Sequence, residues 1–148
     1  MDRVEVSYKE LTENDAVLVK EAIDAMKLSY SPYSNFTVGS AVRLANGCIV
    51  KGANQENASY PVGICAERSA IYTAQNLYPD VPITAIALAG KKRNHNMTND
   101  FVTPCGMCRQ SIAELELRYK QPVRILMCSS EKVAIIESVS KLLPWAFC

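Results

Sequence analysis

The pattern of hydrophobic and polar positions predicts helices and strands that alternate along the chain. Residues 12–30 carry apolar side chains near helical spacing, with Thr12 or Asn14 as the expected N-cap. Pro32 disfavours helical geometry in the residue before it, so this helix is expected to end near Ser31. Two more helices are predicted over residues 65–77 and 103–119, and a short one, broken by a proline, over 139–148.

Five segments have the pattern of β-strands. The first two flank Asn46-Gly47, which is a strong signal for a hairpin turn. The third is a continuous apolar run, typical of a strand buried on both faces. The predicted strands are residues 36–44, 48–53, 83–89, 123–128 and 132–136. Strands alternating with helices predict an α/β layer fold, and the hairpin makes the sheet mixed.

The third predicted helix has a specific expected start. Thr103 would be its N-cap and Pro104 its first helical residue, because proline is favoured at that position. Cys105 and Cys108 would then both lie in its first turn.

Composition and charge exclude some classes of function. The chain has 148 residues, 49% hydrophobic and 21% charged, as expected for one globular domain spanning residues 1–148. The formal net charge of +1 argues against a partner such as a nucleic acid polymer, which requires a strong basic patch. No apolar run approaches the roughly 20 residues that span a bilayer, and the first residues are too polar for a signal peptide. We therefore expect a cytoplasmic protein without a membrane partner.

Six cysteines carry the first chemical signal. In a reducing compartment, clustered cysteines are typical of metal ligands or redox groups rather than disulfides. Cys105 and Cys108 form a close pair, whereas Cys48 and Cys128 lie in apolar runs and are expected to be small core residues. No role is predicted for Cys148.

Cys65, Cys105 and Cys108 are the predicted metal ligands. All three fall near predicted helix N-termini, which are electropositive and favour the thiolate form that binds metal. Three protein ligands leave tetrahedral zinc one open position, which is typical of a catalytic site. The single histidine, His95, lies in a polar loop and is expected to be solvated.

Glu67 is the candidate for proton transfer beside the metal. A carboxylate there can take a proton from water and return it to a leaving group. The alternative is an ordinary surface glutamate in the first turn of a helix, where the dipole favours it. Two residues along a regular helix turn by about 200°. Cys65 and Glu67 can therefore face one cavity only if Cys65 lies at an irregular helix entry.

Charge balance adds Arg68 to the candidates. Zn²⁺ with three thiolates sums to a negative charge, which opposes acidification of a bound water. Arg68 is three residues from Cys65 and within reach of its sulfur, where it would withdraw electron density. A solvated surface arginine is the alternative, and Arg109, next to Cys108, is a weaker candidate for the same role.

Five ordered motifs give the chain a resemblance to a known family. They are SPYSNFTVG (31–39), GANQENASYP (52–61), CAERSA (65–70), PCGMCRQ (104–110) and LLPWAF (142–147). Over nearly its whole length the chain resembles the small homotetrameric zinc-dependent cytidine deaminases of pyrimidine salvage. Three cysteine ligands, a glutamate that is not a ligand and a P-C-x-x-C element are general features of zinc deaminases that act on bases. The resemblance implies a three-layer α/β/α domain with a five-stranded sheet and one Zn²⁺ per subunit.

The resemblance also implies substrate contacts. The backbone N–H of Ala66 would donate to the pyrimidine carbonyl, Asn54 and Glu56 would bind the ribose 3′-hydroxyl, and Phe36 would pack near the base. Asn54 and Glu56 are two residues apart, so in an extended segment both side chains point to one side. Without the resemblance, a polar turn would be the preferred interpretation of these residues.

Further implications concern assembly. The resemblance implies a homotetramer with active sites near the subunit interfaces. Phe147 would reach into the active site of a neighbouring subunit, and Tyr33 and Tyr60 would contribute intersubunit contacts nearby.

The expected reaction is the hydrolysis of cytidine or 2′-deoxycytidine to the uridine nucleoside and ammonia, with Glu67 as the proton shuttle. One alternative is a deaminase for another small cytosine nucleoside, such as a nucleoside antibiotic. A zinc-stabilised interaction protein without activity is a second, and a thioredoxin-like redox role for Cys105 and Cys108 is a third.

Overall fold

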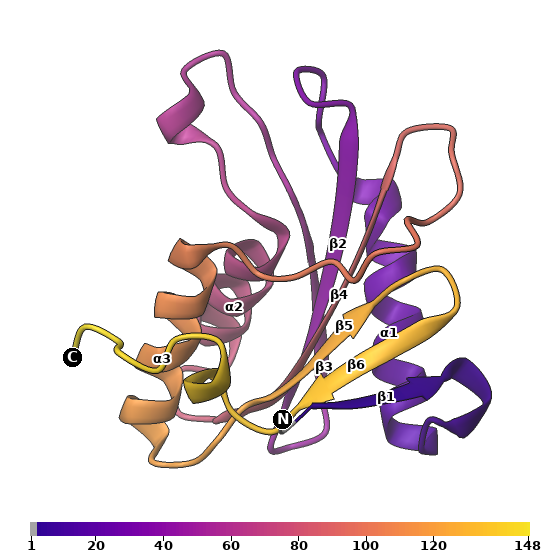
Figure 1. The fold of residues 1–148 in the computed structure, drawn as a ribbon. Coiled ribbons are helices and arrows are strands. Elements are labelled where there is room, and N and C mark those ends of the chain that lie inside the picture. The colour runs from indigo at the N-terminus through magenta and orange to yellow at the C-terminus, as the bar shows by residue number, and fades with distance from the viewer. Residues whose placement is uncertain (1–2) are drawn as a thin grey trace.

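A six-stranded mixed sheet forms the centre of the computed structural model, which describes residues 3–148 (Figure 1). The strand order is β1-β6-β5-β4-β2-β3. β4 and β5 run parallel, and every other neighbouring pair is antiparallel. The strands are β1 (Val4–Ser7), β2 (Phe36–Leu44), β3 (Ile49–Ala53), β4 (Ile83–Lys92), β5 (Arg124–Cys128) and β6 (Lys132–Ile136).

Helices cover both faces of this sheet. α1 (Glu13–Ala25) packs on one face, and α2 (Ala66–Leu77) and α3 (Gly106–Tyr119) pack on the other (Figure 1). The side chains of β4 alternate accordingly, because successive residues of a strand point to opposite faces. Ile86 lies in the core cluster with α2 and α3, whereas Ala87 lies in the cluster with α1. The predicted three-layer α/β/α arrangement is therefore confirmed.

The number of strands is where the prediction was wrong, because the sheet has six strands rather than five. β1 adds an outer strand that pairs antiparallel with β6, with Val4 opposite Ile135. Its four residues, VEVS, are too few for a periodicity signal and follow a polar start. β6 supplies the hydrogen bonds that make this segment a strand, and that pairing is tertiary.

One predicted helix boundary is confirmed, and two predicted helices differ from the structure. The side chain of Thr12 caps α1 as predicted, accepting a hydrogen bond from Asp15 N at 3.2 Å. The prediction for α3 was wrong, because the helix begins at Gly106 with Cys105 as its N-cap. The backbone of Cys105 is extended, and its carbonyl accepts the first helical hydrogen bond, from Arg109 N at 2.9 Å. Before it, Val102 N donates to Cys128 O at 3.0 Å, at the end of β5. The predicted terminal helix is only a 3₁₀ turn over Val139–Lys141.

Gly52 allows α2 to lie directly on β3. A β-carbon at this position would sit 2.4 Å from the backbone nitrogen of Ala70 and 2.7 Å from the carbonyl oxygen of Ala66. Both atoms belong to the first half of α2, and real side chains do not approach backbone so closely. The missing side chain therefore fixes the position of the N-terminal half of α2 against the sheet.

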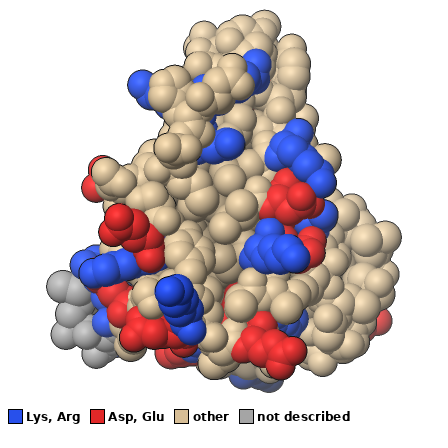
Figure 2. Space-filling view, turned by 90° about the vertical axis from the view of Figure 1, so that its right-hand side faces the viewer, with Lys and Arg blue, Asp and Glu red and all other residues tan. Residues whose placement is uncertain are grey.

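The surface charges on the face that α1 covers are mixed. Acidic and basic side chains lie side by side there (Figure 2). Lys51 pairs with Asp24 at 2.9 Å and with Glu21 at 3.3 Å. The α-helices formed by residues 3–148 are all too short or too polar to cross a bilayer.

Candidate functional site

The N-termini of α2 and α3 bring three cysteine sulfurs together. Cys65 is the N-cap of α2 and Cys105 the N-cap of α3, while Cys108 is the third residue of α3. The three sulfurs lie within 4.8 Å of one another, with Cys65 to Cys105 at 3.6 Å and Cys105 to Cys108 at 3.5 Å. The backbone of Cys65 is extended (φ −72°, ψ 155°), which is the irregular helix entry that lets Cys65 and Glu67 face the same place.

The sulfur spacing fits a tetrahedral metal ion. Zinc–thiolate bonds of about 2.3 Å with tetrahedral angles separate two sulfurs by about 3.8 Å. The two measured distances, 3.5 and 3.6 Å, are close to that value. Among residues 3–148, these three side chains are the set that can hold a metal ion, and His95 lies elsewhere, bonded to Arg93 O.

Arg68 lies against this cluster. Its Nη2 is 3.6 Å from the sulfur of Cys65, and its Nε is buried without a hydrogen-bond partner in the described part of the chain. A hydrogen bond from the Cys108 thiol, with smaller contributions from Arg68 and Cys105, lowers the pKa of Cys65 to about 5 despite its partial burial. The bond to Cys65, with burial, raises the pKa of Cys108 well above the usual thiol value. These contacts favour a thiolate within the sulfur cluster, which is the form that binds a metal ion.

Glu67 is buried and interacts with the Cys65 and Cys108 side chains, with 4% of its surface exposed. In the metal-free protein, burial raises the pKa of its carboxyl to about 7, and the negative charge of Cys65 acts in the same direction. Hydrogen bonds and the Arg68 charge oppose that rise. A carboxyl that titrates near neutral pH can both accept and donate a proton, as general acid–base chemistry requires.

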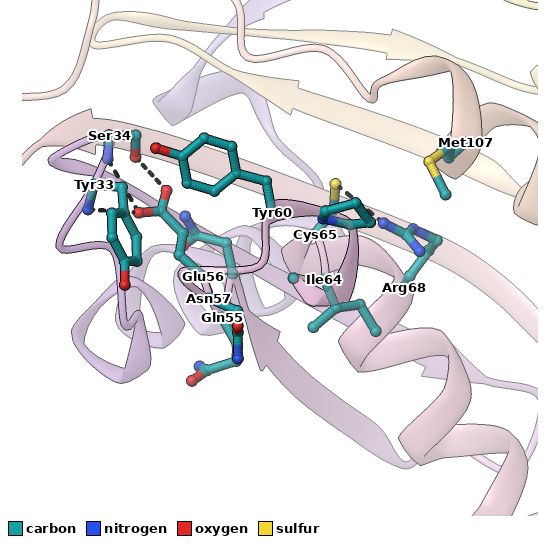
Figure 3. A pocket seen from close by; sticks show the side chains of 13 residues that line it. Tyr33, Ser34, Gln55, Glu56, Asn57, Tyr60, Ile64, Cys65, Arg68 and Met107 are labelled. Carbon is teal, nitrogen blue, oxygen red and sulfur yellow. Dashed lines mark hydrogen bonds between the residues drawn. The ribbon is translucent and has the colours of Figure 1, made fainter.

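An open cavity of about 570 Å³ leads to this centre (Figure 3). That size is typical of small-molecule sites. Its lining residues come from the 31–35 turn, the segment after β3 and the first turns of α2 and α3. They are Tyr33, Ser34, Asn54, Gln55, Glu56, Asn57, Tyr60, Pro61, Gly63, Ile64, Cys65, Arg68 and Met107.

Glu56 binds the 31–35 turn at the far end of the cavity from Cys65 (Figure 3). One carboxylate oxygen accepts from Tyr33 N at 2.9 Å and Ser34 N at 3.0 Å, and the other accepts from Ser34 Oγ at 2.5 Å. Desolvation alone would raise the pKa of Glu56, but these hydrogen bonds and the charge of Arg93 lower it below the ordinary glutamate value. The carboxylate is therefore ionised and held in one orientation.

Asn54 is held as firmly. Its Oδ1 accepts from Ser29 Oγ at 2.5 Å and Val38 N at 2.9 Å, and its Nδ2 donates to Phe36 O at 2.9 Å. A carboxamide nitrogen carries two hydrogens. The second one is available to a ligand in the cavity.

Six predicted site residues are not among those that line this cavity: Phe36, Ala66, Glu67, Cys105, Cys108 and Phe147. Four of them, Ala66, Glu67, Cys105 and Cys108, belong to the N-termini of α2 and α3, next to the lining residue Cys65. Phe36 opens β2, and its ring lies over Gly90 so closely that a β-carbon there would be 2.9 Å away. Phe147 is 88% exposed, but its backbone is fixed by Gln110, whose Nε2 donates to Phe147 O at 2.6 Å and whose Oε1 accepts from Phe147 N at 3.3 Å. Arg109 donates to the carbonyls of Pro104 and Leu142 rather than to a sulfur.

The prediction missed several residues that shape the site. Met107 lines the cavity. It lies between Cys105 and Cys108 in the sequence, and this place in the PCGMCRQ motif could have identified it. Ser29 and Gln110 act through hydrogen bonds to residues 25 and 37 positions away, respectively. No local pattern marks such contacts.

The site combines three sulfurs that could hold a metal ion with a buried carboxyl, on a mixed sheet covered by helices, and comparisons with known proteins identify the family. Residues 12–121 match the family described as "Cytidine and deoxycytidylate deaminase zinc-binding region". A cytidine deaminase of Halalkalibacterium halodurans is 37% identical over 131 residues, covering 88% of this chain and 92% of that protein. One from Sporosarcina psychrophila is 39% identical over 131 residues, covering 88% of each. The crystal structure of a Burkholderia pseudomallei cytidine deaminase superimposes with a TM-score of 0.74 at 34% identity, covering 93% of this chain and 100% of that one.

The chain therefore belongs to the cytidine and deoxycytidylate deaminase family, whose members are zinc-dependent hydrolases.

Proposed function

We propose that this protein hydrolyses cytidine and 2′-deoxycytidine to uridine and 2′-deoxyuridine, with release of ammonia, in pyrimidine salvage. The observation that carries the proposal is a buried carboxyl, Glu67, beside three clustered thiols at the end of a cavity of about 570 Å³. Membership of the deaminase family supports the same reaction.

Cys65, Cys105 and Cys108 would hold one zinc ion per chain. When bound, the ion supplies a Lewis acid that makes a water molecule a nucleophile at neutral pH. The guanidinium of Arg68, 3.6 Å from the Cys65 sulfur, offsets the negative charge of three thiolates. It also favours the thiolate form before metal arrives.

Glu67 would move both protons of the reaction. It accepts one from the attacking water and delivers it to N3 of the pyrimidine, while the water oxygen bonds to C4. It then carries the second proton to the amino group, which leaves as ammonia. A pKa raised by burial suits a group that alternates between base and acid.

The rest of the cavity would orient the nucleoside. The backbone N–H of Ala66 lies in the first turn of α2 and has no intrahelical partner, so it can donate to the pyrimidine carbonyl. The second Nδ2 hydrogen of Asn54 and a free lone pair of Glu56 would bind the 3′-hydroxyl of the sugar. Phe36 would pack near the base after a small rearrangement, because its ring lies over Gly90 in this structure.

We also propose a homotetramer in which Phe147 enters a neighbouring site. Trp145 and Phe147 are 94% and 88% exposed although the tail backbone is fixed. Tyr60, 74% exposed, packs edge-on to Tyr33 at the mouth of the cavity. Large exposed side chains on a fixed backbone are suited to contact with another chain.

The test is an absorbance assay for loss of cytidine with zinc analysis on the same sample. We expect turnover of cytidine and 2′-deoxycytidine with about one zinc per chain. A cytosine nucleoside antibiotic in the same panel tests the alternative substrate class. Absence of turnover despite one bound zinc would contradict the proposal, and turnover of the antibiotic alone would replace its substrate.

A further inference from the structure

The turn formed by residues 29–35 connects both sugar-binding candidates to one another. Ser29 Oγ donates to Asn54 Oδ1 at 2.5 Å, and the backbone N–H groups of Tyr33 and Ser34 donate to Glu56. The backbone joins them as well, because Tyr30 N donates to Asn54 O and Glu56 N donates to Tyr30 O. Any movement of this turn would therefore move Asn54 and Glu56 together.

Arg93 holds the same turn from the side that faces away from the cavity. Its backbone N–H donates to Asn35 O at 2.9 Å, and its Nη2 donates to Ser31 Oγ at 3.4 Å. Ser31 is fully buried, and its Oγ lies 3.2 Å from Ser29 Oγ. A chain of hydrogen bonds thus leads from the Arg93 guanidinium through two serines to the Asn54 carboxamide.

The backbone around Arg93 is itself fixed. His95 N donates to Lys92 O at 3.1 Å, and the His95 ring contacts Arg93 O at 2.9 Å. Asn94 has a positive φ of 61°, which closes the turn after Arg93. The side chain therefore leaves from a defined position at the end of β4 rather than from a loose loop.

Charge adds a second connection. The positive charge of Arg93 is one of the influences that lower the pKa of Glu56. Arg93 is not among the residues that line the cavity, and instead borders a separate hollow with Thr37 and Lys91. It can therefore act on a bound nucleoside only through the residues that it holds.

We infer that Arg93 is a positioning residue for the sugar-binding pair, acting on Asn54 through Ser31 and Ser29 and on Glu56 through its charge. This inference rests on the proposed function. It adds the turn after β4 to the elements that determine affinity for the sugar. Because Arg93 touches no reacting atom, it should affect KM and leave kcat unchanged.

The experiment compares Arg93→Gln with wild type on two substrates that differ only at the sugar, 2′-deoxycytidine and 2′,3′-dideoxycytidine. We expect Arg93→Gln to raise KM for 2′-deoxycytidine about three- to fivefold, the size of a partly exposed charge contact. KM for the dideoxynucleoside should not change, because it lacks the hydroxyl that Asn54 and Glu56 would bind. Lys92→Gln is the matched control, since it removes the same charge one residue away and should change neither KM.

Two further variants separate the effect of the hydrogen bonds through Ser31 and Ser29 from the effect of the Arg93 charge. Ser31→Ala breaks the serine relay and keeps the charge, so it should raise KM for 2′-deoxycytidine by less than Arg93→Gln does. Arg93→Lys keeps the charge and should recover part of the lost affinity. Thermal midpoints within about 2 °C of wild type would show that the variants are folded, given that about 1 kcal/mol moves the midpoint by several degrees.

Uridine and 2′,3′-dideoxyuridine, titrated by calorimetry, give the same comparison without turnover. A wild-type protein that binds these nucleosides but does not deaminate cytidine would overturn the proposed function and leave the role of Arg93 measurable. An equal loss for both members of a pair, or no loss in Arg93→Gln, would overturn the role of Arg93.

Discussion

The two ends of the cavity are built in different ways. At the metal end, the N-termini of two helices fix three sulfurs and a carboxyl that is 4% exposed. At the opposite end, Asn54 and Glu56 sit on an irregular segment and are held by hydrogen bonds from a turn. The first end depends on regular backbone geometry and burial, and the second on contacts between loops. In the proposed function, the sugar of the nucleoside binds at the end with Asn54 and Glu56, which we call the sugar end. Substitutions at the metal end should therefore lower turnover, whereas those at the sugar end should weaken substrate binding.

The largest effect is expected from Glu67→Gln, which tests whether the metal end determines turnover. We expect kcat to fall by about 10²- to 10⁴-fold, because the variant removes the group that we propose carries both protons. The zinc content should be unchanged, since Glu67 is not one of the clustered sulfur ligands. Steady-state kinetics with metal analysis measures both quantities.

Glu13→Gln is the matched control for Glu67→Gln, because Glu13 also lies in the first turn of a helix but is exposed. Its kinetics should equal those of wild type. Full activity in Glu67→Gln would show that the carboxyl is merely a favourable first-turn residue.

A smaller effect is expected from Arg68→Gln at the same end. Loss of the guanidinium removes the positive charge 3.6 Å from the Cys65 sulfur. We expect kcat to fall by about 10- to 100-fold and zinc to be lost to a chelator more readily. Competition with a coloured chelator measures the second effect. Arg118→Gln, at the far end of α3, is the control and should change neither kcat nor the loss of zinc. An unchanged zinc affinity in Arg68→Gln would contradict the role proposed for Arg68.

The smallest effect is expected from Glu56→Gln, a substitution at the sugar end. The amide can still accept from Tyr33 N and Ser34 N, so the turn should persist while the charge is lost. We expect KM for cytidine to rise about tenfold, as for one hydrogen bond to a charged group, with kcat nearly unchanged. A fall in kcat without a change in KM would reverse the assignment of the two ends.

The difference between local geometry and contacts between loops also explains which features the sequence predicts. The family resemblance implies the three-layer α/β/α arrangement. Periodicity predicts the alternation of helices and strands, and cysteine spacing predicts that Cys105 and Cys108 lie together at the start of one helix. The reach of Arg68 to Cys65 follows from three residues of helix. These features depend on local geometry, which short patterns encode.

Tertiary contacts account for the rest. β1 is a strand because β6 pairs with it, and the segment before α3 is joined to the end of β5 by the hydrogen bond from Val102 N to Cys128 O. The connection of Ser29 to Asn54 and of Gln110 to Phe147 crosses 25 and 37 residues. No window of sequence contains both partners, so such contacts appear only in the folded structure.

The fixed C-terminal tail has an optical consequence. Trp145 is the only tryptophan in the chain, and it is 94% exposed although its neighbour Phe147 is bonded to Gln110. An indole in water emits at the red end of its range, and contact with another chain would shift that emission to shorter wavelengths. The fluorescence of the unmodified protein, followed on dilution, would therefore report whether another chain covers the tail.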